Sequence, residues 1–240
     1  MNEADFVAEL DRELEWRSAE VRRLRNLITN DNDELARDEL RKALVVLLYS
    51  HFEGFCVFAL QHYRLAVNQE KMSCGVAIPA IVAGAWDQVF TAMQTGDEKC
   101  KVFLKVLPDD TKLHRHWRRR HFVEEVERLK TLSVEVPEDV IDAESNLKVS
   151  VLQRNLFVLG LDHQFVDPHV GSIQRLLKTR NDIAHGNRRK GVAELEYKEL
   201  ESAVNNICKK LIELLVESHR KQQFRLNPIT YSAAASLPST

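Results

Sequence analysis

The stretch ALVVLLY, residues 43–49, decides the fold. Its seven consecutive apolar residues leave no polar face, so a helix through them has to be surrounded by other helices. Asp33 is a suitable N-cap for this helix, which we expect to run from about Glu34 to Asn68. At a rise of about 1.5 Å per residue it would be about 50 Å long. The sequence therefore predicts a long, buried helix at the centre of the molecule.

Composition and periodicity extend the helical prediction to the rest of the chain. Only 8 of the 240 residues are Gly and 6 are Pro, so few residues interrupt helices. Apolar side chains recur every three or four positions, and no run of alternating residues indicates a strand. We therefore expect an all-α fold. The helices are predicted at residues 4–28, 34–68, 76–94, 99–107, 111–130, 146–160, 168–185 and 192–225.

The helical pattern weakens in three segments, and these segments define the predicted domain organisation. Residues 30–33, Asn-Asp-Asn-Asp, are predicted to separate the first helix from the second. Residues 70–145 are the least regular part and are predicted to be an insertion that decorates a helical core. The tail, residues 226–240, is rich in Ser, Ala and Pro and is expected to be flexible. We predict one helical domain over residues 1–225.

Charge, cysteines and missing motifs limit the function. The 34 basic and 36 acidic residues give a net charge of −2, so any attraction to nucleic acid has to be local. The four cysteines lack C-x-x-C spacing and are typical of thiols in a reducing compartment. Without a recognisable signal peptide or membrane span, we expect a cytoplasmic protein. No Gly-rich phosphate loop, G-x-S-x-G, H-E-x-x-H or paired-carboxylate motif is present, so enzyme classes other than nucleases have no support.

The segment LLKTRNDIAHG, residues 176–186, combines an arginine and a histidine at a predicted helix end. Cleavage of RNA by its own 2′-OH requires proton transfers and stabilisation of a negatively charged phosphorane. A histidine such as His185 is suited to the proton transfers. The planar fork of Arg180 is suited to the phosphate oxygens. Such chemistry requires neither a metal nor a cofactor.

This segment resembles the R-x4–6-H signature of the HEPN superfamily, with a four-residue spacer and the polar Asn181 directly after the arginine. Residues 47–55, LLYSHFEGF, are similar to the corresponding helix of the HEPN clade in toxin–antitoxin and phage-defence loci, the RiboL-PSP-HEPN type. The resemblance covers about residues 40–65 and 150–215. It implies an antiparallel helical bundle, with the segment between these blocks as a helical insertion.

The resemblance also implies an assembly and an activity. HEPN proteins usually dimerise with two motifs face to face, so Arg180 and His185 of both chains would line one cleft. The implied function is a metal-independent endoribonuclease, acting as a toxin or anti-phage effector and restrained by an antitoxin or another regulatory protein. The alternative is a non-catalytic HEPN module that binds a partner protein or RNA.

Three further residues are candidates for supporting roles. Asn181 would bind the phosphate or hold the histidine tautomer. Glu53, on the buried helix, would orient Arg180 or His185, or form a buried ion pair with a nearby arginine. Asp182 is expected to be a solvent-facing or helix-end residue, and a supporting role in the site is the alternative. On a regular helix, residues five apart point about 140° away from each other, so the site depends on the helix ending at His185.

Two basic segments are candidates for RNA contact. Arg188, Arg189 and Lys190 directly follow the motif and would raise the local concentration of RNA or simply form a charged loop. Arg118, Arg119 and Arg120 belong to a basic cluster around Trp117 that spans residues 112–121. This cluster would bind RNA phosphates, form a solvated helix paired with nearby acids, or contact an acidic partner.

Overall fold

The computed structural model describes residues 1–29, 33–96, 98–103, 110–142 and 146–227. Over these ranges the regular structure is helical, and the pairing of extended backbone is limited to two isolated bridges, Ser73 with Ser133 and Ala77 with Arg225. The predicted all-α class is confirmed. The predicted break at residues 30–32, the last four residues of the predicted helix at 99–107 and most of the predicted tail lie outside the described residues. Residues 99–103 are not helical, so that prediction is wrong over this part, where the Cys100 amide donates to His114 instead of to a helical carbonyl.

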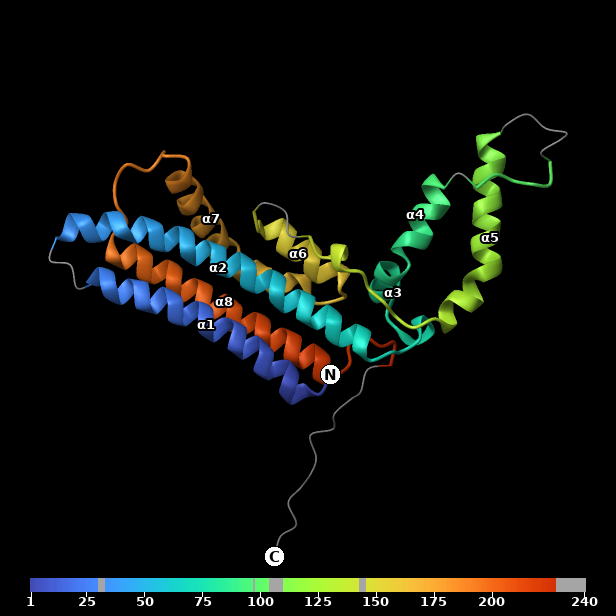
Figure 1. The fold of residues 1–240 in the computed structure, drawn as a ribbon, viewed down its shortest axis with the longest axis horizontal. Helices are drawn as coiled ribbons and strands as arrows, with labels where there is room; N and C mark the ends of the chain where they lie inside the picture. Colours follow the sequence, from blue (N-terminus) through green and yellow to red (C-terminus); the bar gives the residue numbers. More distant parts are fainter. Residues whose placement is uncertain (30–32, 97, 104–109, 143–145, 228–240) are drawn as a thin grey trace, which may run out of the picture.

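Three long helices form a bundle: α1 (Glu3–Thr29), α2 (Glu34–Gln69) and α8 (Glu194–Arg220) (Figure 1). α1 runs opposite to α2 and α8, and α2 packs against both of them and against α7 (Val170–Ala184). The backbone amide of Leu35 donates to the carboxylate of Asp33 at 2.9 Å, so the predicted cap of the central helix is confirmed. The long central helix predicted from residues 43–49 is therefore the axis of the fold.

Buried residues recur along most of the length of α2, from Arg41 to Val67. By length and composition α2 would qualify as a membrane span, and half of its most apolar 18-residue window is buried inside the protein. Burial on several sides is what an all-round apolar core helix requires. Its fully covered side chains belong to one continuous core with α1, α7 and α8. They include Leu44, Val45, Leu48, Tyr49, Phe52, Phe55, Cys56, Ala59, Leu60, Tyr63, Ala66 and Val67.

The helix that carries the motif begins differently from the prediction. Asp167 and Pro168 do not start it. They lie inside a 3-10 helix, η3 (His163–His169), whose N-cap is Asp162. The Asp167 carboxylate instead accepts a hydrogen bond from Gln153 of α6 (Val149–Val158) at 3.1 Å, so it is not available to cap α7. A tertiary contact thus moves the start of α7 to Val170.

The segment between α2 and α6 forms an arm that projects away from the bundle (Figure 1). It contains η1 (Cys74–Val76), α3 (Pro79–Ala85), α4 (Asp87–Thr95), α5 (Thr111–Thr131) and η2 (Glu138–Val140). The single helix predicted at 76–94 is wrong. The backbone leaves the helical conformation at Trp86 (φ −102°, ψ 13°), whose ring is buried near Phe90 and Phe122, with centroids 6.3 and 6.2 Å away. This packing joins α4 to α5.

The base of the arm is continuous with the bundle. The backbone amides of Cys74 and Val134 donate to Leu132 and Met72, each at 2.8 Å. Arg64 of α2 donates to the carbonyl of Val136 at 2.8 Å. The arm is therefore hydrogen-bonded to the end of α2, while its tip, α4 and α5, lies away from α7. The prediction of one domain with an insertion stays a prediction.

Candidate functional site

The motif lies at the C-terminal end of α7. His185 caps the helix with its backbone amide donating to the Asn181 carbonyl at 2.9 Å. Gly186 has a φ of +71°, in the left-handed region that glycine adopts without strain, and its amide donates to Ile183 at 3.1 Å. The predicted helix end at His185 and Gly186 is confirmed. The chain consequently turns away from the helix directly after His185.

Arg180 is held by side chains from three separate segments. Its guanidinium carbon lies 4.9 Å from the centroid of the Tyr49 ring on α2, a favourable cation–π arrangement. Its Nη1 donates to Asn146 Oδ1 at 3.0 Å and to Asn181 Oδ1 at 2.9 Å. The half-buried guanidinium is thus fixed in one orientation. Its Nε is buried and has no hydrogen-bond partner.

A buried hydrogen-bond network holds Tyr49 itself. The backbone amide of Leu147 donates to the Tyr49 hydroxyl and to Glu53 Oε1, each at 2.7 Å, and the hydroxyl donates to the same carboxylate oxygen at 3.2 Å. Burial, with a contribution from the Glu53 charge, raises the pKa of Tyr49 to about 12, so the phenol stays protonated. The network connects α2 to the segment that carries Asn146.

Glu53 therefore reaches the motif indirectly. We expected it either to orient Arg180 or His185 or to form an ion pair with an arginine. Among the described residues its hydrogen bonds are to Tyr49 and Leu147. Glu53 fixes the hydroxyl of the ring on which Arg180 lies, and it is a positioning group rather than a direct ligand of the motif.

His185 has a different environment from Arg180. Its side chain is exposed and has no hydrogen bond or ion pair in the part of the chain that the structure describes. On a regular helix its direction would differ from that of Arg180 by about 140°. A single chain thus offers a fixed cation and a separate, accessible imidazole, and no hydrogen bond joins the two side chains among the described residues.

The residues after the motif have distinct surroundings. Arg188 forms a two-pronged ion pair with Glu196 at 2.8 and 2.6 Å and donates to the Gly191 carbonyl at 3.0 Å. The hydrogen bonds to Glu196 raise the pKa of Arg188 and lower that of Glu196. Arg188 therefore fixes the loop before α8, and its guanidinium is occupied. The side chains of Arg189 and Lys190 are exposed and unpaired among the described residues.

Asp182 lies between the motif and this loop. Its carbonyl accepts a hydrogen bond from the Arg188 amide at 2.9 Å, and its half-buried carboxylate also raises the pKa of Arg188. These contacts stabilise the turn that ends α7. The contacts favour the helix-end role for Asp182.

The three consecutive arginines of α5 are not equivalent. Arg118 donates to the carbonyls of Met93 and Glu98 at 3.0 and 3.2 Å, and Arg120 pairs with Glu124 at 2.7 Å. Arg119 is exposed and has no partner among the described residues. α5 lies at the opposite end of the molecule from α7 in Figure 1, so one chain does not bring its basic helix to the motif.

Two residues of this site escaped the sequence analysis. Tyr49 appeared only as the last apolar residue of the central helix, although a buried tyrosine hydroxyl needs a hydrogen-bond partner and so signals a polar contact. Asn146 has no local signal, because it reaches Arg180 only through the path of the chain before α6.

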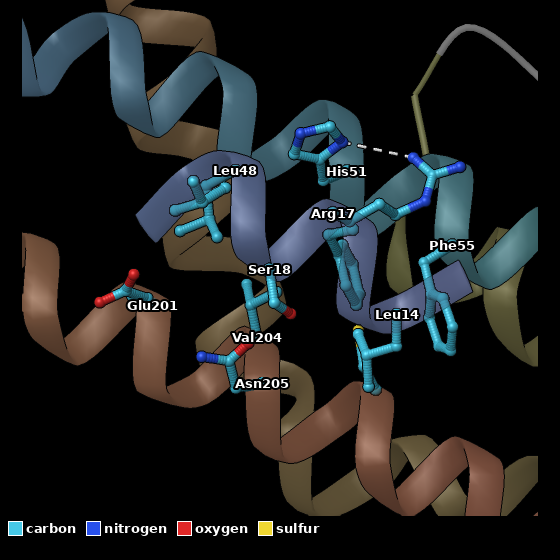
Figure 2. A pocket seen from close by; sticks show the side chains of 12 residues that line it. Leu14, Arg17, Ser18, Leu48, His51, Phe55, Glu201, Val204 and Asn205 are labelled. Atoms are coloured by element: carbon cyan, nitrogen blue, oxygen red, sulfur yellow. Dashed lines mark hydrogen bonds between the residues drawn. The ribbon is translucent and has the colours of Figure 1, made fainter. Parts of the chain in front are cut away.

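A second polar cluster lies between α1, α2 and α8 (Figure 2). Arg17 Nη1 donates to His51 Nδ1 at 3.3 Å, and Arg17 Nη2 pairs with Glu13 at 2.6 Å. Gly54 leaves room for this guanidinium, since a Cβ there would lie 2.8 Å from Nη1. Burial and the Arg17 charge lower the pKa of His51. Because Arg17 is neutralised by Glu13, we interpret the cluster as a polar seam within the bundle.

Comparison with protein families matches the family described as HEPN_MAE_28990-like HEPN over residues 6–224. The matched span includes the bundle, the motif at the end of α7 and the whole arm. The segment at 70–145, for which the resemblance in sequence had no counterpart, therefore lies inside the matched region. No curated protein and no solved structure matches the chain.

Proposed function

The chain belongs to the HEPN_MAE_28990-like HEPN family, and on that premise we propose that it is an endoribonuclease with a composite site. HEPN domains are often ribonucleases, and they commonly act as dimers and bind RNA. In our proposal Arg180 and His185 of two chains line one cleft. The observation that carries it is the fixed guanidinium of Arg180, followed at the C-cap of the same helix by an exposed His185 that is unpaired among the described residues.

The proposed reaction is attack of a ribose 2′-oxygen on the adjacent phosphorus. The 2′-O–P bond forms and the P–5′-O bond breaks, leaving a 2′,3′-cyclic phosphate and a 5′-hydroxyl. One His185 accepts the 2′ proton and its counterpart in the second chain protonates the leaving 5′ oxygen. Two copies of the motif thus provide both the base and the acid, which a single imidazole cannot provide at once.

Arg180 has the electrostatic role in this scheme. Its Nη2 has no hydrogen bond to any described residue, so it can donate to a phosphorane oxygen, and the positive charge of the guanidinium stabilises the phosphorane. Asn181 accepts a hydrogen bond from Arg180 through Oδ1, so its amide nitrogen remains able to donate to a phosphate oxygen. The histidine and arginine chemistry does not call for a metal ion or a cofactor.

We further propose that the activity serves as a toxin or anti-phage effector in the cytoplasm. The likeness of residues 47–55 to HEPN proteins of toxin–antitoxin and phage-defence loci supports this role. A ribonuclease of this kind has to be restrained in its own cell, so an antitoxin or another regulatory protein would bind or modify the chain. Expression alone should slow growth, and His185→Ala should remove the effect.

The direct test is cleavage of single-stranded RNA by purified protein in EDTA. We expect His185→Ala and Arg180→Ala each to lower the rate by about 10²–10³-fold or more. His163→Ala and Arg175→Ala are matched controls, since His163 is an exposed residue of η3 and Arg175 is an exposed residue of α7. The nuclease assignment is wrong if the two motif variants cut as fast as wild type. Tight RNA binding without cleavage by wild type would favour the non-catalytic module.

The composite site has a test of its own. A chain that carries both Arg180→Ala and His185→Ala should form mixed dimers with wild type that lack one copy of the motif. Because the proposed reaction needs an imidazole from each chain, we expect cleavage at constant total protein to fall with about the square of the wild-type fraction. A linear decline would contradict the sharing of residues between chains, while leaving the nuclease assignment standing.

A further inference from the structure

The N-terminal half of α5 carries an unusual concentration of positive charge. Residues 111–123 contain five Lys or Arg residues, three His and no acid. Four of these side chains recur at spacings of three and four, which places them on one face of the helix. All four are exposed. We call this set the outer stripe: Lys112, Arg115, His116 and Arg119.

The structure separates the outer stripe from the other basic residues of the helix. None of its four side chains has a hydrogen bond or ion pair with any described residue. By contrast, Arg118 donates to two carbonyls of the α4 segment, and Arg120 pairs with Glu124. His114 is buried and accepts a hydrogen bond from the Cys100 amide at 3.1 Å. Arg118, Arg120 and His114 thus hold the arm together or pair locally, while the outer stripe is available.

The position of α5 leaves the outer stripe uncovered. The helix packs against α4 and η1, and the arm projects away from the bundle in Figure 1. α4 contacts Arg118 and Phe122, whose directions lie about 80–160° around the helix axis from those of Lys112 and His116. The stripe therefore faces solvent, without any described neighbour to neutralise it.

We propose that the outer stripe binds the phosphodiester backbone of single-stranded RNA, as a second contact remote from Arg180. Neighbouring side chains of the stripe have Cβ atoms about 5–6 Å apart, and each Lys or Arg can neutralise a phosphate and release its counterion. Protein interfaces have an apolar core, whereas this face offers little apolar surface beyond Val123. A polar, strongly positive face is typical of nucleic-acid contacts.

The identification of RNA as the ligand rests on the proposed function, whereas the existence of an exposed, unpaired basic surface does not. A backbone contact away from the reacting phosphate would increase the affinity for RNA without changing the chemical step. We therefore expect the outer stripe to lower KM for long RNA and to leave kcat unchanged. The effect should disappear for oligonucleotides too short to reach from α7 to α5.

The test measures binding of an uncleavable 2′-O-methyl oligoribonucleotide at increasing salt. The test variant is Lys112→Ala, Arg115→Ala and Arg119→Ala combined. The control is Arg120→Ala, Arg128→Ala and Lys130→Ala combined, on the same helix, with the same change in net charge and with every cation paired to an acid. Thermal unfolding of both variants checks that the arm remains folded.

We expect the outer-stripe variant to lower the slope of log affinity against log salt by about 2, since each lost phosphate contact contributes about 0.7 for a single strand. The control should change the slope much less. An unchanged slope, or equal reductions in both variants, would overturn the proposal. Capture of an acidic protein by the stripe with an unchanged RNA slope would also overturn it. Because the oligonucleotide cannot be cleaved, the slope is independent of whether Arg180 and His185 are catalytic.

Discussion

The end of α7 and the outer stripe of α5 both present arginines, but they constrain them in opposite ways. Arg180 lies on the Tyr49 ring and is hydrogen-bonded to two asparagines, so its guanidinium has one orientation. Arg115 and Arg119 have no described partner and are exposed. A group that stabilises a transition state needs fixed geometry, whereas a surface that attracts phosphates needs only charge. The surroundings of an arginine, more than its presence, indicate which task it can perform.

The two regions should also respond differently to salt. Exposed charges are screened by ions over about 8–10 Å at ordinary ionic strength, and a partly buried group such as Arg180 is screened less. The binding contribution of the outer stripe should therefore decrease as salt increases. The chemical step at α7, measured at saturating RNA, should change little.

The strongest test of this contrast is Arg-to-Lys substitution in each region. Arg180→Lys keeps the charge but loses the planar fork and its stacking on Tyr49, so we expect kcat to fall by about 10²-fold. Arg119→Lys keeps everything that the outer stripe needs, so affinity and kcat should remain within about two-fold of wild type. Single-turnover cleavage and oligonucleotide binding measure the two quantities.

Either substitution can contradict the proposed contrast between Arg180 and the outer stripe. If Arg180→Lys retains full activity, the guanidinium acts only as a charge and its restraints are structural. If Arg119→Lys weakens binding as much as Arg119→Ala, the stripe recognises phosphates through fixed geometry, as the α7 site does.

Removing the restraint on Arg180 without removing Arg180 should have an intermediate effect. Tyr49→Leu removes the ring beneath the guanidinium and the hydroxyl of the network, and we expect kcat to fall about ten-fold with RNA affinity unchanged. Tyr49→Phe keeps the ring and should have a smaller effect. Thermal unfolding monitors the stability that is lost with a buried tyrosine.

A double-mutant comparison separates positioning from general destabilisation. In an Arg180→Ala background, Tyr49→Leu should cause no further loss of cleavage, because its effect on the rate passes through Arg180. A ten-fold loss that persists in this background would assign Tyr49 a purely structural role.

The sequence predicted those features that depend on neighbours along the chain. The buried central helix follows from its all-round apolar stretch, and the helix end follows from Gly186, because helical periodicity and backbone conformation are local properties. The restraints on Arg180 are not local. Tyr49 and Asn146 come from other segments, so their roles appear only once the chain has folded.

The same limit explains the errors in the arm and around α7. The break at Trp86 depends on packing between α4 and α5, and Asp167 fails to cap α7 because Gln153 binds its carboxylate. Composition predicts that α5 is basic, but it does not predict which cations of α5 lack a partner. Which arginines are paired depends on where α4 places its carbonyl groups, as at Arg118.

A smaller effect should follow from changing the helix end beside His185. In Gly186→Ala the new side chain has open space, but the φ of +71° strains any residue with a Cβ. We expect a loss of about 1–2 kcal/mol in unfolding free energy. Cleavage should slow a few-fold, since strain would shift the direction of His185.

Gly171→Ala is the matched control on the same helix. Gly171 lies near the start of α7, also has open space around it and has no positive φ, so alanine should stabilise the protein by about 0.5–1 kcal/mol. Denaturant unfolding of both variants measures the difference. Equal stability of the two would show that the turn after His185 does not depend on glycine. Neither substitution should change the salt slope set by the outer stripe.

The smallest effect concerns pH and lies far from both regions. The Phe6 ring is stacked between His62 and His219, with centroids 4.9 and 4.6 Å away. Burial lowers the pKa of both histidines, and the charges of Glu3 and Glu70 oppose this shift at His219 only in part. Both imidazoles are therefore neutral in the folded state at a pH where the unfolded chain begins to bind protons, at about pH 6.5 and below. Acid should thus weaken the bundle.

Cleavage should therefore decline in acid as the bundle loses stability. We expect the melting temperature to decrease from about pH 7.5 to about pH 5.5, and His219→Gln to reduce that slope whatever its effect on absolute stability. A pH slope unchanged by His219→Gln would exclude this histidine as a source. The rate at saturating RNA, corrected for the folded fraction at each pH, separates this loss of stability from the pH dependence of the chemical step itself.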